Sequence, residues 1–382
     1  MTKRATPIEH VALHAWLATA LGIAGLEITD AKTPGAGGWS SETWILTLRD
    51  RARGAAADRR VVLRLAPAGP AMFPEYDLSR QVACMQALKV AGSCPVPDML
   101  AEDLSGAVIG RPLYVMEFIS GDVPSDDTPN LFEAGFLFDA SPADQQRFHQ
   151  AFIAALATLH MSPLTDELSR KLGRPNAGPT ALARELGWLR GVFDWDHGPA
   201  PQPVIERALD MLNARLPNDP RQVLLWGDAR PANVVVRDFV PIALLDWELA
   251  TLGPPELDVF WLIEMNRMRS RGRLLPGFLS DAESIASYEA LTGRDLRGAD
   301  WHTLFAATKV ALLMLRHLLV RVASDELPGD HPILTDNVAT RRLSALLAQA
   351  TPWRDNGADG SPSARGHNPS PHKTSPTVTE AD

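Results

Sequence analysis

The chain has 382 residues, a length that favours two domains or two lobes over one small core. Its residues are 45% hydrophobic and 22% charged, which excludes a mainly disordered chain, and its net charge of −9 argues against nucleic-acid binding by phosphate neutralisation. Only two cysteines occur, Cys84 and Cys94, so no disulfide framework is expected. Sparse cysteine use is typical of a reducing compartment, and we expect a cytoplasmic protein.

The first 119 residues predict a lobe of strands with one long internal helix. After an amphipathic helix near the N-terminus, a glycine cluster at 35–38 precedes an alternating strand at 44–48. The segment "RRVVLRLAP" completes a hairpin whose opening loop is rich in glycine. A helical stripe follows and is closed by Gly92, and then "VPDMLAED" and "PLYVMEFISGD" predict two more strands. The expected order is therefore strand, strand, helix, strand, strand.

From residue 120 the hydrophobic pattern becomes helical. Ser141 as N-cap and Pro142 at the first helical position predict the start of a helix. Further helices are expected in "ALARELGWLRGVF" and "PVIERALDMLNARL". His160 lies at the end of the helix that Ser141 caps, where it could bond the last carbonyl groups.

Two late segments bear on membranes and disorder. The apolar stretch 304–323 is long enough to span a bilayer, but Lys309, Arg316 and Arg321 would then enter lipid. We therefore expect a buried helix and no membrane span. Residues 353–382 contain almost no apolar side chains and are expected to form a disordered tail.

The stretch "VLLWGDARPANVVV" at 223–236 contains the residue types that phosphoryl transfer requires. Asp228 could accept the proton of an acceptor hydroxyl, and Arg230 could reach the transferred phosphoryl group. Asn233 and Asp246, separated by a predicted hairpin, offer the oxygen ligands that Mg²⁺ prefers. By themselves Asp228 and Asn233 could equally be turn residues, because both types favour turns.

"GDARPAN" matches the Asp-x-x-x-x-Asn catalytic loop of protein kinases and aminoglycoside phosphotransferases. In detail the chain resembles phosphotransferases related to the kinase-like domains associated with acyl-CoA dehydrogenases. The segments that carry this resemblance, within residues 8 to 350, are "GGWSSET", "FPEYDL", "GDARPANV" and "LDWELATLGPPELD".

The resemblance implies an α+β, two-lobed protein-kinase-like fold. Its N-terminal lobe, residues 1–119, would be an antiparallel β-sheet with a helix that binds ATP. A mainly α-helical lobe, residues 120–352, would hold the catalytic residues and the acceptor. Asp258 would support the catalytic loop by accepting backbone N–H bonds.

The resemblance also assigns roles to residues that bind the nucleotide. Arg64 stands where kinases place a strand lysine that contacts the phosphates, and Gln81 stands where the helix gives that lysine a Glu partner. The backbone of the hinge strand would bond adenine. The residues expected to cover the phosphates are Gly37, Gly38, Ser40 and Ser41, and those expected at adenine are Glu117 and Ile119.

The expected activity is that of a phosphotransferase that uses ATP and Mg²⁺ to phosphorylate a hydroxyl group of a small molecule. The resemblance suggests a hydroxyacyl-CoA as acceptor, and an aminoglycoside or macrolide antibiotic is the alternative within the same class. A nucleotide-binding, pseudokinase-like regulatory protein is the alternative from another class, because Arg64 and Gln81 replace the usual Lys and Glu.

Overall fold

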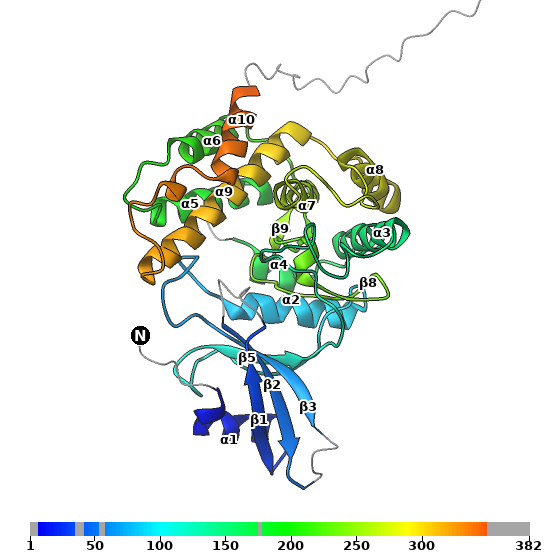
Figure 1. Cartoon of the computed structure of the whole chain (residues 1–382), viewed down its shortest axis with the longest axis vertical. Helices are drawn as coiled ribbons and strands as arrows, with labels where there is room; N and C mark the ends of the chain where they lie inside the picture. Colours follow the sequence, from blue (N-terminus) through cyan, green and yellow to red (C-terminus); the bar gives the residue numbers. More distant parts are fainter. Residues whose placement is uncertain (1–6, 35–41, 53–57, 175–177, 350–382) are drawn as a thin grey trace, which may run out of the picture.

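The computed structural model describes residues 7–34, 42–52, 58–174 and 178–349. It forms two lobes, one of strands and one mainly of helices (Figure 1). The predicted phosphate-covering residues Gly37, Gly38, Ser40 and Ser41 lie outside the described residues, as does the predicted tail at 353–382.

The strand lobe contains an antiparallel sheet of five strands in the order β1-β2-β3-β5-β4. The elements of this lobe are η1 (Pro7–Glu9), α1 (Val11–Ala20), β1 (Leu26–Lys32), β2 (Glu42–Asp50), β3 (Arg59–Leu65), α2 (Leu78–Ala91), β4 (Met99–Asp103) and β5 (Leu113–Glu117). The sequence did not predict β1, because its polar residues hide the alternation and Ile28 is its one buried side chain. The other strands and the helix that ends at Gly92 are confirmed.

The two faces of the sheet are covered by different helices. Leu13 and Leu17 of α1 pack with Leu46 and Leu63 in a core that belongs to the strand lobe alone. Helix α2 covers the other face, and its buried residues join the core of the helical lobe. Figure 1 shows α2 lying along the boundary between the lobes. The sheet of the strand lobe is therefore tied to the helical lobe through α2.

The helical lobe surrounds two small antiparallel sheets. Its elements are α3 (Pro142–His160), α4 (Asp166–Leu172), α5 (Ala181–Trp195), α6 (Pro203–Ala214), β6 (Val223–Leu225), η3 (Pro231–Asn233), β7 (Val234–Arg237), β8 (Val240–Leu244), β9 (Thr251–Gly253), α7 (Glu256–Arg269), α8 (Asp281–Thr292), α9 (Ala299–Ala323), η4 (Pro332–Leu334) and α10 (Val338–Gln349). Strand β6 pairs with β9, and β7 pairs with β8. The predicted cap is confirmed, since the Ser141 hydroxyl accepts from the N–H of Asp144 at the start of α3.

Helix α9 is, within the described part of the chain, the one helix long and apolar enough to cross a membrane. Of its most apolar window, 72% is buried inside the protein, as expected for a core helix. Its basic residues Lys309, Arg316 and Arg321 have protein partners. Arg316 donates to the carbonyl groups of Ala71 and Met72, which precede α2, so α9 also joins the two lobes.

Candidate active site

A tight hairpin brings Asn233 and Asp246 together. Strands β7 and β8 pair Val234 with Leu244, and the N–H of Leu245 donates to the carbonyl oxygen of Asn233 at 2.8 Å. The turn residues Asp238 and Phe239 have φ values of 50° and 60°, the backbone of a two-residue type I′ turn. The hairpin predicted from the sequence is confirmed, and it places the two expected metal ligands on neighbouring segments.

The carboxylate of Asp228 is held by three donors. The indole Nε1 of Trp261 donates to Oδ1 at 2.9 Å. The amide Nδ2 of Asn233 and the Nε of Arg230 donate to Oδ2 at 2.8 and 2.9 Å. Asp228 is buried, with 8% of its surface exposed. A carboxylate with this many donors keeps a fixed direction, which a group that orients an acceptor hydroxyl needs.

The backbone beneath Asp228 is fixed by Asp258, near the start of α7. Its carboxylate accepts the N–H of Trp226 at 2.7 Å and the N–H of Gly227 at 2.9 Å. Asp258 thus supports the loop as the sequence predicted. The expectation for His160 was wrong: its ring bonds the hydroxyl of Tyr288 and the carboxylate of Asp258, because the ring points into the lobe rather than along its own helix.

Gly227 has to be glycine. Its φ is +80°, in the left-handed region, and an added Cβ would lie 2.0 Å from the carbonyl oxygen of Leu249. The turn that carries Leu249, between β8 and β9, therefore touches the backbone next to Asp228. This close approach explains why the loop enters its turn through a Gly-Asp pair.

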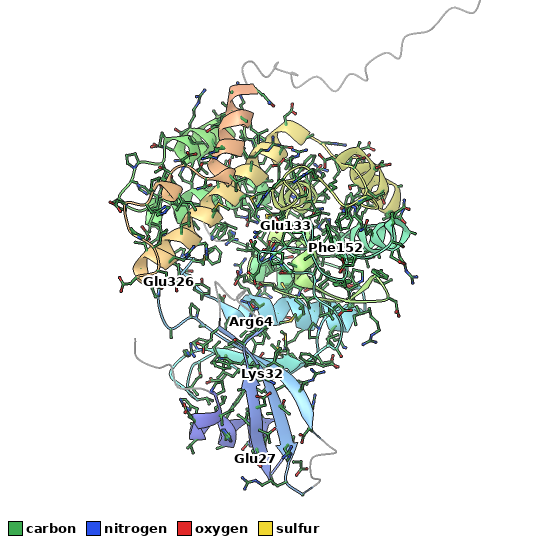
Figure 2. The ribbon with its side chains drawn as sticks, in the orientation of Figure 1. Glu27, Lys32, Arg64, Glu133, Phe152 and Glu326 are labelled. Carbon is green, nitrogen blue, oxygen red and sulfur yellow. The ribbon has the colours of Figure 1, made fainter. Side chains whose placement is uncertain are left out.

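Arg64 reaches from β3 in the strand lobe to the metal-ligand candidates of the helical lobe. Its Nη2 lies 2.9 Å from Oδ1 of Asp246 and 3.8 Å from Oε2 of Glu248. Figure 2 shows Arg64 at the junction of the two lobes. Burial alone would lower the pKa of Arg64, but the charges of Asp246 and Glu248, the nearby Tyr114 and the hydrogen bond to Asp246 together outweigh burial and raise the pKa. Arg64 is thus a permanent cation between the lobes.

The helix partner expected for this cation is occupied elsewhere. Gln81 on α2 accepts a hydrogen bond from the Tyr114 hydroxyl at 2.9 Å. The Nε of Arg64 is buried and has no hydrogen-bond partner among the described residues. A buried donor without a partner is costly, so this atom fits a site that receives an anionic ligand such as a phosphate.

Arg230 continues a chain of charges away from Asp228. It pairs with Asp126, in the segment that follows the hinge, and Asp126 also pairs with Arg269 at the end of α7. Burial alone would lower the pKa of Arg230, but the charges of Asp228 and Asp126 raise it. Asp126 lies in the polar stretch "PSDDTPN", where nothing in the sequence separates it from an ordinary loop residue.

The hinge residues lie where the strand lobe meets the hairpin. Glu117 ends β5 and its N–H donates to the carbonyl of Asp98, so a base could be bonded only by its carbonyl group. Ile119 lies two residues further on and is half-buried. Asp122 then forms a bridge with Val236 of β7, which ties the hinge to the metal-ligand hairpin.

Three further residues at the site were missed by sequence reasoning. Glu248 lies near Arg64 and could have been found, since it is a second carboxylate two residues after Asp246 in "LDWE". Trp261 lies on α7 and Lys309 on α9, far from the motif in sequence. Lys309 gave a signal of its own, because a charge in an apolar helix indicates a buried partner.

Asn233 and Asp246 fit a nucleotide-bound Mg²⁺ better than a metal held by protein alone. In the described ranges, no three His, Cys, Asp or Glu side chains gather to hold a metal. Mg²⁺ at a nucleotide needs only one or two protein oxygens, with phosphates and water completing its shell. Asn233 uses its amide nitrogen toward Asp228, so its amide oxygen is the atom that could serve as ligand.

A comparison with models of protein families shows to which family this chain belongs. The model of the "Phosphotransferase enzyme family" matches residues 33–294, which include Arg64, the catalytic-loop candidates and the hairpin. The chain belongs to this phosphotransferase family. The match covers both lobes, from the end of β1 to the end of α8.

Individual phosphotransferase-family relatives share the fold over most of the chain. A putative aminoglycoside phosphotransferase from Ralstonia eutropha is 23% identical with a TM-score of 0.61, and the match covers 88% of this chain and 94% of that one. Spectinomycin phosphotransferase, solved with ADP and spectinomycin, is 13% identical with a TM-score of 0.55, over 89% and 99% of the two chains. The expected two-lobed kinase-like fold is therefore confirmed.

Sequence comparison finds a different kind of relative. Acyl-CoA dehydrogenase family member 10 of mouse is 29% identical over 228 residues, which are 58% of this chain and 20% of that protein. The chain spans between 20% and 31% of the length of the curated relatives that it matches. The similarity is thus confined to one part of these longer proteins.

Proposed function

We propose that this phosphotransferase uses ATP and Mg²⁺ to phosphorylate a hydroxyl group of a small molecule in the cytoplasm. The observation that carries the proposal is the contact between lobes, in which Arg64 of the sheet lies 2.9 Å from Asp246 of the hairpin. This contact supports the proposal because it joins the proposed phosphate-binding cation to the proposed metal ligand beside the proposed catalytic loop. We divide the chain into a nucleotide lobe at 1–119, a catalytic and acceptor lobe at 120–352, and a tail at 353–382.

In this proposal Asp228 orients the acceptor hydroxyl and accepts its proton. Arg230 leaves Asp228 to contact the transferred phosphoryl group. Asn233 and Asp246 would hold Mg²⁺, which when bound neutralises charge on the phosphates. Arg64 contacts the phosphates, and its Nε, which has no partner in the part of the chain that the structure describes, supports this role.

The remaining nucleotide contacts follow the hinge and the glycine-rich loop. The backbone groups of Glu117 and Ile119 would bond adenine at the junction of the lobes. The loop with Gly37, Gly38, Ser40 and Ser41 connects β1 to β2 and would cover the phosphates.

The acceptor that we favour is a hydroxyacyl-CoA. Support comes from the end of α7, where Arg269 pairs with Asp126, and from the residues after it, where Arg271, which pairs with Glu133, and Arg273 are exposed. Cationic side chains on the acceptor lobe favour an acceptor with phosphate groups over a cationic aminoglycoside. The kinship with acyl-CoA dehydrogenase family members points the same way.

The alternative of a nucleotide-binding protein without turnover has one observation in its favour. Gln81 bonds Tyr114 and gives Arg64 no charge partner. Against it, Asp246 and Glu248 lie beside Arg64 and supply the missing carboxylates. The complete set of Asp228, Asn233 and Asp246 also favours turnover.

The test of the proposal is Asp228→Asn. The amide is nearly isosteric and leaves Arg64 and Asp246 unchanged, so ATP should bind with nearly unchanged affinity in calorimetry. Turnover with hydroxyacyl-CoA should be lost, because an amide cannot accept the hydroxyl proton. Asp336→Asn, which changes an exposed carboxylate paired with Arg341, is the matched control and should keep full activity. Wild-type turnover in Asp228→Asn would contradict the assignment.

A further inference from the structure

Trp261 is the donor to Oδ1 of Asp228, and the proposed reaction leaves this donor in place. In the structure Oδ2 of Asp228 receives bonds from Asn233 and Arg230, and Oδ1 receives the indole N–H of Trp261. The proposed function moves Arg230 to the phosphoryl group, which frees Oδ2 to face the acceptor hydroxyl. The Trp261 bond to Oδ1 then keeps the carboxylate from rotating.

The indole ring is itself held by a buried cation. The Nζ of Lys309 lies 4.6 Å from the centre of the Trp261 ring, in the geometry of a cation–π contact. Lys309 is 7% exposed, and burial lowers its pKa, while the charges of Glu185, Asp258 and Asp228 oppose that shift. A cation in such surroundings has few alternative positions.

Lys309 also holds the backbone next to Asp228. Its Nζ donates to the carbonyl oxygen of Gly227 at 2.6 Å, and the N–H of the same glycine donates to Asp258 at 2.9 Å. Gly227 is thus fixed at both of its peptide groups, in a left-handed conformation that few residues adopt. One side chain connects the backbone of the loop with the ring that bonds its carboxylate.

We propose that Trp261 and Lys309 are positioning residues that fix Asp228, with Trp261 setting the direction of its carboxylate and Lys309 setting the ring and the loop backbone. This inference rests on the proposed function for its kinetic consequence. The assignment of roles to the two oxygens follows: Oδ1 is bound by the protein throughout, and Oδ2 faces the acceptor.

The kinetic test uses the full chain with ATP, Mg²⁺ and a hydroxyacyl-CoA. Trp261→Phe keeps the ring and removes the donor, and a hydrogen bond to a charged group is worth a factor of about 10 to 100. We expect kcat to fall by that factor, with the KM for ATP changed by less than about twofold because Arg64 and Asp246 are untouched. Lys309→Met should lower kcat in the same direction.

Trp301→Phe is the matched control, because it also removes a buried indole bond, here to the carbonyl of Leu212 at 3.1 Å. It should keep the wild-type kcat even if it costs stability. A wild-type kcat in Trp261→Phe would overturn the inference, and an equal fall of kcat in both variants would reduce it to a general effect on folding. If Lys309→Met does not fold, Trp261→Phe still decides.

A spectroscopic arm separates this inference from the proposed function. The indole N–H resonance of Trp261 is identified by its loss in Trp261→Phe. It should shift and exchange faster with solvent in Asp228→Asn and in Lys309→Met, while that of Trp301 stays unchanged. With Mg²⁺ and a non-hydrolysable ATP analogue, the Trp261 resonance should stay and the Nε–H resonance of Arg230 should move. An unchanged Trp261 resonance in Asp228→Asn overturns the inference. If the wild type transfers no phosphoryl group but these shifts occur, the proposed function fails and the positioning of Asp228 stands.

Discussion

Asp258→Asn should destabilise the protein strongly, because Asp258 is 1% exposed and its carboxylate has three donors as partners. The amide keeps one acceptor oxygen and turns its NH₂ group toward an N–H donor. One buried donor is left without a partner, at about 1–3 kcal/mol, and the other bonds lose their charged acceptor, at about 1 kcal/mol each. The sum is roughly 3–5 kcal/mol.

Thermal unfolding followed by circular dichroism measures this cost. For a protein of this size, 3–5 kcal/mol corresponds to a fall in Tm of about 4–6 °C. Asp336→Asn, in an exposed ion pair, should lower Tm by less than about 2 °C. The affinity for nucleotide should fall by a smaller factor than kcat, because the substitution removes the support of the loop under Asp228 and leaves Arg64 unchanged. A Tm within 2 °C of the wild type would refute the view that Asp258 holds the catalytic loop.

Two more substitutions test the backbone of the loop and the cation between the lobes. Gly227→Ala places a Cβ against the Leu249 carbonyl and should unfold or inactivate the protein. Gly92→Ala, at φ +61° with no atom within 4 Å of the new Cβ, is the control and should cost only about 1–2 kcal/mol of stability. Equal Tm values for the two variants would contradict the contact between Gly227 and Leu249. Arg64→Met leaves Asp246 without its cation and should lower the stability of the protein by about 3–5 kcal/mol. Mg²⁺ alone should raise the Tm of this variant more than that of the wild type, because Mg²⁺ can replace the lost charge. The same Mg²⁺ shift in both proteins would count against Asp246 as a metal ligand, and Arg59→Met at the exposed end of β3 is the control.

The parts of the fold that local signals encode could be predicted from the sequence. Ser141 and Gly92 mark helix ends through capping and a left-handed backbone, which depend only on neighbouring residues. The hairpin at 234–244 could be predicted because a short turn separates two apolar runs. Strand β1 could not be predicted, since its stability comes from pairing with β2 rather than from its own hydrophobic pattern.

The residues of the candidate site also divide into those that the sequence could indicate and those that it could not. Asp228, Asn233 and Asp246 lie close in sequence, so one motif suggested that they act together. The contact between Arg64 and Asp246 spans 182 positions and depends on how the lobes are joined. Trp261 contacts Asp228, and Lys309 contacts the Trp261 ring, only after α7 and α9 have packed. No rule of sequence spacing could therefore have indicated these two residues.

The most direct test of the central claim is ATP consumption by the full chain across hydroxyacyl-CoAs, free hydroxy acids, aminoglycosides and macrolides. We predict ADP formation that depends on Mg²⁺ and on a hydroxyacyl-CoA, with one phosphoryl group appearing on the acceptor by mass spectrometry. Tight binding of ATP with no acceptor consuming it would contradict the account and favour a nucleotide-binding protein without turnover.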